Sequence, residues 1–378
     1  MIDRDIWRSR IHRAWAQVPV VWLSGVRRVG KTTLARQFPE AELINCDLPS
    51  THRRLEDPER FLASFAGKAV VFDEIHQLPD PSHLLKIAAD EFPRLKVLAT
   101  GSSTLAATLK FRDSLTGRKR KVHLPPVLHS ELAAFGVRDL ERRLLHGGLP
   151  EPLLAETKDP EFFSEWLDSY FSRDVQELFR VSKRREFLLL VQSLMRSSGG
   201  LLEITTLAKH CGLSRPTVMS YLDALQITHL VTLIPPFHGG GRQELLRQPK
   251  AYGFDTGFVT FARGWDLLRP SDLGELWEHL VLETLLAEIG PERVRFWRDK
   301  QKREIDFVVT GNRGHVHAVE CKWKSDAWSP RNLAAFRKLH PNGLNIVLSP
   351  QLEPAMARRR GGFEVVFSHL AEAVSMVR

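Results

Sequence analysis

The sequence is poor in cysteine, with only three among its 378 residues: Cys46, Cys211 and Cys321. They are odd in number, widely separated and without the spacing of metal-binding cysteine pairs, which argues against both a disulfide framework and a cysteine-based metal site. Reduced, buried thiols are typical of cytoplasmic proteins, so we expect a cytoplasmic location.

Long apolar runs are absent as well. No stretch approaches the roughly 20 apolar residues that a membrane-spanning helix needs, and the charged segment from Met1 to Trp7 lacks the apolar core of a signal peptide. We therefore expect no membrane partner.

Acidic residues are fewer than basic ones, 45 against 54, and the formal net charge is +9. This excess suggests a polyanionic partner such as DNA, although bound nucleotide alone does not require it.

The most informative segment is an uninterrupted phosphate-loop motif, G-x-x-x-x-G-K-[ST], from Gly25 to Thr32. It follows the apolar run Val20–Leu23 and precedes the helix-forming run Thr33–Phe38, which is the strand–loop–helix context that the motif requires. Backbone N–H groups of such a loop, together with the helix N-terminus, bind phosphate. Lys31 is expected to reach the β- and γ-phosphates, and Thr32 to coordinate Mg²⁺. The predicted cofactors are ATP and Mg²⁺, and the predicted nucleotide-binding residues are Gly25, Val26, Arg27, Arg28, Val29, Gly30, Lys31, Thr32 and Thr33.

Two further apolar runs end in polar residues. The run Lys68–Phe72 ends in Asp73 and Glu74. A parallel strand beside the phosphate loop would place Asp73 in the Mg²⁺ shell and Glu74 where it polarises the attacking water. The run Leu95–Ala99 leads into Thr100 and Ser102, whose hydroxyls are candidates for contact with the γ-phosphate or the water; a capped turn is the alternative, above all for Ser103. The predicted catalytic residues are Glu74, Thr100 and Ser102.

The order of predicted elements indicates an α/β fold. A chain of 378 residues exceeds what one hydrophobic core supports, so two or three domains are expected. Up to residue 135, strands alternate with helices, which predicts a parallel sheet with helices on both faces. Residues 136–197 read as a helical linker. Residues 198–256 and 257–378 are expected to form two further domains.

Residues 198–256 carry a helix-turn-helix pattern. The run Ile204–Cys211 is followed by a turn at Gly212 and by a second helix that Ser214 caps. Two β-type runs, Leu230–Ile234 and Ala251–Phe254, would complete a winged helix. Such modules bind DNA or proteins. The predicted DNA contacts are Arg215, Thr217 and Ser220, which on the alternative interpretation only solvate an exposed face.

Residues 257–378 have the element order of the PD-(D/E)XK nucleases, a helix followed by three strands. Asp306 begins the second strand, and Glu320-Cys321-Lys322 ends the third. Two hard carboxylates, Asp306 and Glu320, suit Mg²⁺, and Glu278 on the preceding helix is a further candidate ligand. Lys322 points to the same strand face as Glu320 and could stabilise charge on a scissile phosphate. The alternative is a scaffold that keeps this fold without cleaving.

Taken together, these motifs resemble the bacterial and archaeal AAA-type ATPases that carry a C-terminal domain of unknown function with a restriction-endonuclease-like core. The resemblance implies that the protein binds nucleotide and has this domain order. It also implies that Arg118 contacts nucleotide, either in its own subunit or in a neighbouring subunit of a homo-oligomer. The chain departs from the usual valine-lysine pair in having Glu320 before Cys321 and Lys322, which is closer to a complete nuclease motif. The resemblance is carried by Gly25–Thr32, Asp73–His76, Thr100–Ser103, Leu115–Arg118, Gly147–Pro150, Tyr170, Arg173-Asp174, Pro249–Tyr252, Asp255–Gly257, Gly274–Glu278, Phe296–Arg298, Glu304–Asp306 and Glu320–Lys322.

Three functions fit these observations. The first is a DNA-associated ATPase, with ATP and DNA as partners, in which the nucleotide state controls a nuclease-like C-terminal module. The second is an ATP-controlled switch for protein interaction without DNA cleavage. The third is a metal-dependent DNA nuclease that ATP licenses. DNA-stimulated ATP turnover separates the first from the second, and plasmid nicking in Mg²⁺ or Mn²⁺ separates the third.

Overall fold

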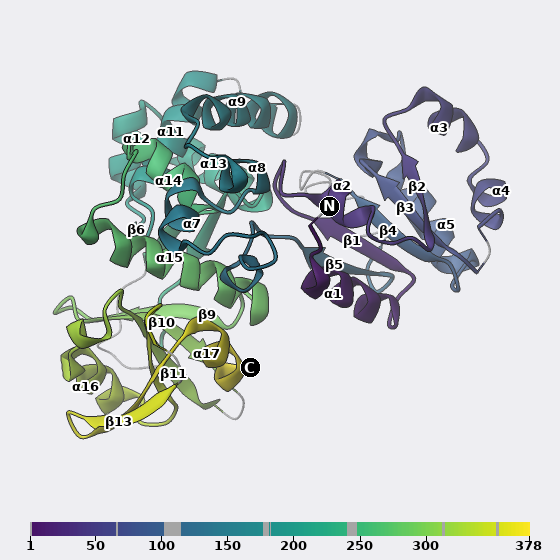
Figure 1. Cartoon of the computed structure of the whole chain (residues 1–378). Helices are drawn as coiled ribbons and strands as arrows, with labels where there is room; N and C mark the ends of the chain where they lie inside the picture. The colour runs from purple at the N-terminus through teal and green to yellow at the C-terminus, as the bar shows by residue number, and fades with distance from the viewer. Residues whose placement is uncertain are drawn as a thin grey trace.

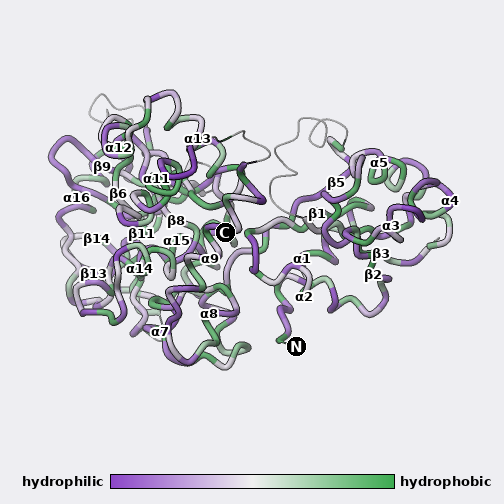
Figure 2. Tube along the Cα trace, turned by 90° about the horizontal axis from the view of Figure 1, so that it is seen from above, coloured by the Kyte–Doolittle hydropathy of each residue, from purple (hydrophilic) through white to green (hydrophobic). Residues whose placement is uncertain are grey.

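The computed structural model describes residues 2–65, 67–101, 115–176, 181, 183–239, 248–311, 314–352 and 355–378. Two lobes are visible in Figure 1 and, from above, in Figure 2. One lobe holds the N-terminal sheet, and the other holds the helices that follow it together with the C-terminal sheet. Serine 102, a predicted catalytic residue, lies outside the described residues.

The N-terminal sheet has five parallel strands in the order β2-β3-β4-β1-β5. Side chains alternate between its faces. Val21, Leu23 and Leu98 pack against helices α1 and α2, whereas Trp22, Val70 and Val97 pack against α4 and α5. Helices on both faces of a parallel sheet confirm the predicted α/β fold of this part. The elements are α1 Asp5–Trp15, β1 Val20–Ser24, α2 Lys31–Ala35, β2 Ala41–Asn45, α3 Pro49–Arg54, α4 Pro58–Ala63, β3 Ala69–Asp73, η1 Ile75–Gln77, α5 Pro81–Glu91, β4 Lys96–Thr100 and β5 Lys119–His123.

The middle part of the chain is mainly helical and carries a small antiparallel sheet in the order β6-β8-β7. Helix α12 ends at Gly212, which has a φ of 66°. Helix α13 starts after Ser214, whose hydroxyl accepts the N–H of Thr217, so two helices meet at a short turn as the sequence predicted. The elements are η3 His129–Glu131, α7 Leu140–His146, α8 Pro150–Leu154, α9 Pro160–Tyr170, η4 Phe171–Val175 (a π-helical turn), α11 Arg184–Arg196, β6 Gly200–Leu201, α12 Ile204–Cys211, α13 Arg215–Ile227, β7 Val231–Ile234, β8 Lys250–Gly253 and α14 Thr256–Arg263.

Helix α14 packs within this middle part, against α7, α9 and α11. Its Phe258 meets Phe163 and Trp166 of α9 edge-on, with ring centroids 4.9 and 4.8 Å apart. The boundary that we drew at residue 256 therefore falls inside one packed unit. Aromatic packing across a hundred residues of chain leaves no mark on the local periodicity of α14, so the sequence pattern alone did not reveal it.

The C-terminal sheet has six strands in the order β13-β14-β12-β11-β10-β9. Strands β9, β10 and β11 form an antiparallel meander, and β11, β12 and β14 run parallel. Helices α15 and α17 cover one face of the sheet and α16 the other. The elements are α15 Pro270–Glu288, β9 Val294–Arg298, β10 Glu304–Thr310, β11 Val316–Cys321, η6 Ser325–Ala327, α16 Pro330–Leu339, β12 Asn345–Leu348, β13 Met356–Arg360, β14 Phe363–Ser368 and α17 Leu370–Val377.

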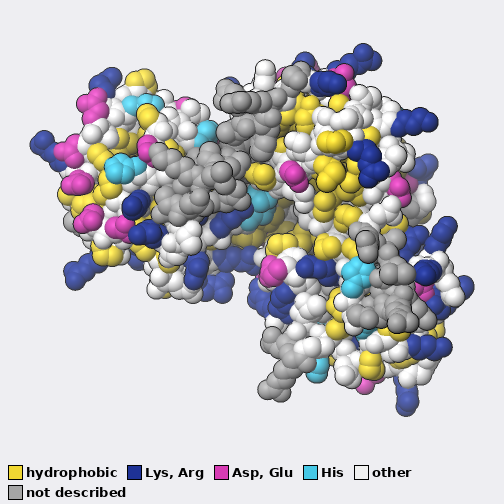
Figure 3. Space-filling model, turned by 180° about the vertical axis from the view of Figure 1, so that it is seen from behind, with side chains coloured by type: hydrophobic (Ala, Val, Ile, Leu, Met, Phe, Trp, Pro, Cys, Tyr) yellow, Lys and Arg dark blue, Asp and Glu magenta, His cyan; other side chains and the backbone are white. Residues whose placement is uncertain are grey.

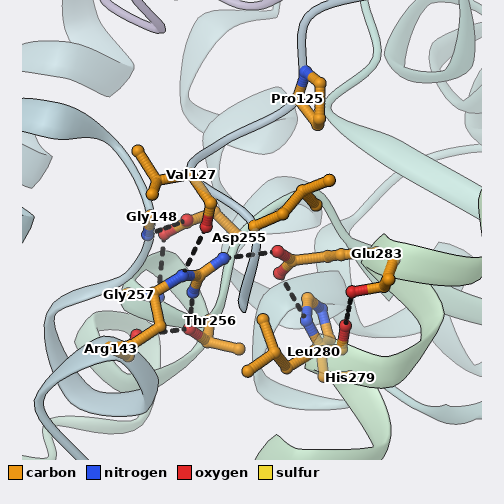
Figure 4. A network of polar contacts seen from close by, with 12 residues as sticks. Pro125, Val127, Arg143, Gly148, Asp255, Thr256, Gly257, His279, Leu280 and Glu283 are labelled. Atoms are coloured by element: carbon orange, nitrogen blue, oxygen red, sulfur yellow. Dashed lines mark hydrogen bonds and ion pairs between the residues drawn. The ribbon is translucent and has the colours of Figure 1, made fainter. Parts of the chain in front are cut away.

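A buried polar network joins the middle part to α15 (Figure 4). The guanidinium of Arg143 has no exposed surface and donates to Val127 O at 2.8 Å, to Thr256 Oγ1 at 2.9 Å and to Glu283. The carboxylate of Asp255, whose pKa burial raises to about 6, accepts the N–H groups of Gly148 and Gly257.

Gly148 is required by this close packing. A Cβ at residue 148 would lie 2.5 Å from the guanidinium of Arg143. The Gly147-Gly148 pair therefore lets α7 and the start of α14 approach around a buried charge.

This network should be essential for stability. Arg143→Met leaves the buried carboxylate of Glu283 without its arginine partner, so we expect the free energy of unfolding to fall by about 3–5 kcal/mol. Arg184→Met is the matched control, because the pair of Arg184 with Asp168 is more than half exposed and should contribute less than about 1 kcal/mol. Urea unfolding measures both variants, and equal losses would contradict the role given to Arg143.

Candidate functional site

The phosphate loop opens onto a cavity of about 840 Å³. It lies at the carboxyl edge of the N-terminal parallel sheet, where ligands bind in open α/β folds. Its lining comes from both lobes, because α8 and the π-helical turn η4 contribute Glu151, Arg173 and Asp174. The remaining lining residues include Ile2, Arg4, Arg27–Leu34, Gln37, Asp47, Glu74, His76, Gln77, Phe135, Pro150 and Leu154.

Close backbone approach shapes the loop itself. Gly30 has a φ of 98° at the start of α2, and a Cβ on Gly25 would lie 2.5 Å from Leu124 O. The ammonium of Lys31 donates to Gly25 O at 3.0 Å and to Val26 O at 2.9 Å. Burial lowers the pKa of Lys31, and the nearby carboxylates of Glu74 and Asp174 oppose that shift. The lysine thus lies folded over its own loop, and its contact with the β- and γ-phosphates stays a prediction.

Asp73 is held by hydroxyl groups from two neighbouring elements. Thr32 Oγ1 donates to the two carboxylate oxygens of Asp73 at 3.1 and 3.0 Å, and Thr100 Oγ1 donates to Oδ1. The structure therefore brings together Thr32 and Asp73, the two residues that we expected to hold Mg²⁺. Helix α2, which carries Thr32, contacts β3, and β4, which carries Thr100, pairs with β3, so both hydroxyls reach Asp73.

Thr100 differs from its prediction. Its side chain is fully buried and does not line the cavity; it donates to Asp73 and accepts the N–H of Glu74 at 3.2 Å. The predicted contact of this hydroxyl is with the γ-phosphate or the water, and that contact stays a prediction. In the structure, Thr100 holds Asp73 and the backbone of Glu74 in place.

Glu74 faces the cavity from a strained position. Its φ of 55° is in the left-handed region, which a residue with a Cβ rarely adopts and which is often found at functional sites. Its Oε2 lies 3.2 Å from Nδ1 of His76. His76, which also lines the cavity, had no role in the sequence prediction beyond its place in the motif.

Arg118 does not reach the cavity. Its guanidinium pairs with Asp90 of α5 at 2.6 Å and is partly exposed. In this arrangement the salt bridge to α5 keeps Arg118 out of the cavity lining, and the contact with nucleotide in cis stays a prediction. A contact with nucleotide in a neighbouring subunit stays a prediction.

Two basic side chains, Arg27 and Arg173, line the cavity, and Arg27 has an acidic partner that its local sequence does not reveal. Arg27 of the phosphate loop lies 3.4 Å from Asp174, whose carboxylate is nearly buried. Arg173, from the same π-helical turn, lines the cavity as well. The Arg173-Asp174 dipeptide belonged to the motifs of the resemblance, but only the fold brings it opposite the loop. The middle part thus contributes two acids, Glu151 and Asp174, and one base, Arg173, to the lining of the nucleotide site.

A second polar site lies on the C-terminal sheet. Nζ of Lys322 is 3.4 Å from an oxygen of Asp306 and 3.4 Å from an oxygen of Glu320, so both predicted metal ligands lie on one face of the sheet. Asp306 Oδ2 also accepts the N–H of Cys321 at 2.7 Å. Burial raises the pKa of Glu320 to about 7.

Glu278, the third predicted ligand, lies on α15 near the same site. Burial raises its pKa, and the proximity of Asp306 adds to the shift. Within the described ranges, no group of three or more His, Cys, Asp or Glu side chains is arranged to hold a metal ion. Two ammonium groups, those of Lys250 and Lys322, lie among the carboxylates instead.

The predicted DNA-contacting residues lie on or beside an exposed face of α13. Arg215 and Ser220 are exposed, and Arg215 donates to Thr205 of α12 at 3.0 Å. Thr217 is half-buried and its hydroxyl bonds to Ser214 at 2.7 Å, so it serves the helix cap as well.

None of the described helices is long and apolar enough to cross a bilayer.

Three family models match successive parts of the chain. Residues 17–133 match the family model described as an AAA domain, residues 137–269 a domain of unknown function (DUF8612), and residues 273–366 another (DUF4143). The uncharacterised protein Rv2008c of Mycobacterium tuberculosis is 31% identical over 333 residues, which cover 82% of this chain and 71% of the relative. The chain belongs to this family of AAA-type ATPases.

More distant proteins are similar along most of the chain. The uncharacterised protein MJ1544 of Methanocaldococcus jannaschii is 23% identical and matches 89% of this AAA-type ATPase and 81% of the relative. Among solved structures, the Walker-type ATPase PABY2304 of Pyrococcus abyssi matches 70% of this chain and 96% of its own, with 18% identity and a TM-score of 0.48.

Proposed function

We propose that this AAA-type ATPase hydrolyses ATP at the cavity beside the phosphate loop and that the nucleotide state controls how its middle and C-terminal parts engage DNA. The observation that supports this most is the lining of the cavity: Arg173 and Asp174 of the middle part face Arg27 of the loop. A bound phosphate would compete with Asp174 for Arg27, so nucleotide binding would change a contact between the lobes.

The residues present fit ATP with Mg²⁺. The glycine-containing loop leaves room for phosphate oxygens, and the hydroxyl of Thr32 and the carboxylate of Asp73 are the hard oxygen donors that Mg²⁺ prefers. When bound, the metal ion supplies positive charge that neutralises the β- and γ-phosphates. The ammonium of Lys31 turns from the loop carbonyls to the phosphates. Glu74 orients water and accepts its proton, while His76, 3.2 Å away, orients Glu74.

Two substitutions should separate binding from turnover. Lys31→Ala removes the buried cation next to the phosphates, so calorimetry should detect no ATP binding. Glu74→Gln keeps the loop intact and should bind ATP, but its turnover should fall by about 100-fold or more, as for the loss of a catalytic base. Lys68→Ala, an exposed lysine before β3, is the control and should behave as wild type. Normal phosphate release by Glu74→Gln would place the base elsewhere.

DNA is the partner that the surface favours. The formal net charge is +9, and from behind (Figure 3) Lys and Arg side chains gather where the lobes face one another. Helix α13 adds exposed Arg215 and Ser220 beside a short turn, the arrangement from which helix-turn-helix proteins contact DNA. Its Asp223 is exposed too, which argues for few phosphate contacts by this helix. A protein partner for the same face is the alternative.

DNA binding should therefore depend steeply on salt, because each neutralised phosphate releases counterions. Arg215→Ala should weaken binding and reduce the slope of log K against log salt by about one. Arg54→Ala, an exposed arginine of the N-terminal lobe, is the control. Duplex DNA should also raise ATP turnover of the wild type. No binding at any salt concentration would assign this face to a protein partner.

A metal site on the C-terminal sheet is a second candidate. Asp306 and Glu320 share the ammonium of Lys322, and Oε1 of Glu320 is buried without a hydrogen-bond partner among the described residues. Oxygen donors of this kind fit Mg²⁺ or Mn²⁺. The metal ion would supply charge for a bound phosphodiester, and Lys322 would orient water there, which would make the domain a DNA nuclease that ATP controls.

Metal binding should then stabilise the domain. Millimolar Mn²⁺ should raise the Tm of the wild type, because a cation that binds only the folded state stabilises it. Asp306→Asn should lose this shift. Lys322→Ala should keep the shift and lose any nicking of plasmid DNA. A Tm shift that survives Asp306→Asn would show that the ion binds elsewhere.

A further inference from the structure

Strand β8 of the middle part contributes two side chains to the acidic site of the C-terminal sheet. Lys250 and Tyr252 are two residues apart and therefore point to the same side of the strand. Nζ of Lys250 lies 2.6 Å from Glu304 and 3.2 Å from Glu278, and the hydroxyl of Tyr252 donates to Glu278 at 2.6 Å. Neither acid belongs to the sheet that contains β8: Glu278 lies on α15 and Glu304 begins β10.

The lysine is buried in this position. Its side chain is 5% exposed, and only its negatively charged neighbours make such burial tolerable. Burial alone lowers the pKa of Lys250, but the charges of Glu278, Glu304 and Asp306 outweigh it, so the pKa is raised. The ammonium therefore stays charged. Its positive charge compensates the negative charges of the acids, as a bound cation would otherwise do.

The charges of the site are almost fully compensated from within the chain. Four carboxylates, Glu278, Glu304, Asp306 and Glu320, lie near the ammonium groups of Lys250 and Lys322, and Arg298 pairs with Glu304 at 3.0 Å. One oxygen, Oε1 of Glu320, is nevertheless buried without a partner in the described part of the chain. The site thus retains an unused ligand atom while its other acids are occupied.

Space is present next to the lysine. A cavity of about 440 Å³ is lined by Lys250, Tyr252, Glu278 and Glu304, together with residues 197–200 that precede and form β6. Because β8 pairs with β6, this cavity is bounded by one small sheet on the side of the middle part. The lysine side chain thus borders open space into which its ammonium could turn away from the acids.

We propose that Lys250 is a built-in counter-ion that closes the acidic site, so that a divalent cation binds Glu278, Asp306 and Glu320 only after the ammonium of Lys250 has been displaced. The inference rests on the proposed metal site and adds its regulation. The middle part that carries β8 also lines the nucleotide cavity through Arg173 and Asp174. A nucleotide-dependent movement of that part would therefore carry the lysine into or out of the acidic site.

Removal of the ammonium tests this directly. Lys250→Met is titrated with MnCl₂ by calorimetry, as the full chain without nucleotide. We expect affinity to rise by about tenfold or more relative to wild type, since one positive charge close to the bound cation is gone. Without metal, the variant should have a lower Tm, which Mn²⁺ should restore. Lys250→Arg, which keeps the charge, should bind Mn²⁺ no more tightly than wild type.

Controls distinguish this site from others. Lys158→Met removes another ammonium, a partly buried one that donates to Thr260 and to Trp265 O, and should lower the Tm without any rescue by Mn²⁺. The double variant Lys250→Met, Asp306→Asn should lose the gain in Mn²⁺ affinity. That loss would exclude the phosphate loop as the place where the additional metal binds. If Lys250→Met does not fold, Tyr252→Phe removes only the hydroxyl that donates to Glu278 and should raise Mn²⁺ affinity in the same direction by a smaller factor.

Each outcome has one meaning. Tighter binding by Lys250→Met that depends on Asp306 supports the inference. Equal, Asp306-dependent binding by wild type and Lys250→Met overturns the inference and leaves the metal site standing. No Asp306-dependent binding by any variant overturns both.

Discussion

The buried guanidinium of Arg143 is the constraint on which the arrangement of this molecule depends. A charge without exposed surface must be compensated, and the compensation comes from Glu283, 140 residues further along the chain. Glu283 can reach Arg143 only if α15 lies against α7 and α14. The position of α15 then determines the acidic site as well, because the same helix carries Glu278 five residues earlier. One ion pair thus holds α15, the helix that carries Glu278, against α7 and α14.

The two polar sites share a physical feature: in each, an ammonium group of the chain itself lies beside the position expected for a charged ligand. Lys31 donates to the carbonyls of its own loop, and Lys250 donates to the acids of the C-terminal site. In the first site the lysine reorients toward a negatively charged ligand and stays. In the second the lysine has the same sign as the expected ligand, so it must leave. The first arrangement prepares binding, whereas the second opposes it.

Local chemistry can be predicted from the sequence. The phosphate loop, Asp73 and Glu74 stand out as short motifs at the ends of predicted strands, and the fold brings Thr32 of α2 to Asp73 of β3. Remote partners cannot be predicted in this way. The direction of the Thr100 side chain depends on its burial between neighbouring elements, and Arg118 is held by Asp90 on a different helix. Lys250 was recognised only as part of a motif, because its partners follow it by 28 and 54 residues.

Communication between the two sites has one available physical basis in the described structure, which is the rigid packing of the middle part. On one side this part lines the nucleotide cavity through the π-helical turn η4; on the other it presents β8 to Glu278 and Glu304. Between them, α9 and α14 pack through aromatic rings, and α14 begins with the residues that hold Arg143 and Gly148. Close-packed interiors transmit displacements rather than absorb them. A shift at Arg27 and Asp174 would therefore reach β8, and Lys250 would move relative to Glu278 because the Arg143–Glu283 pair holds α15 in place.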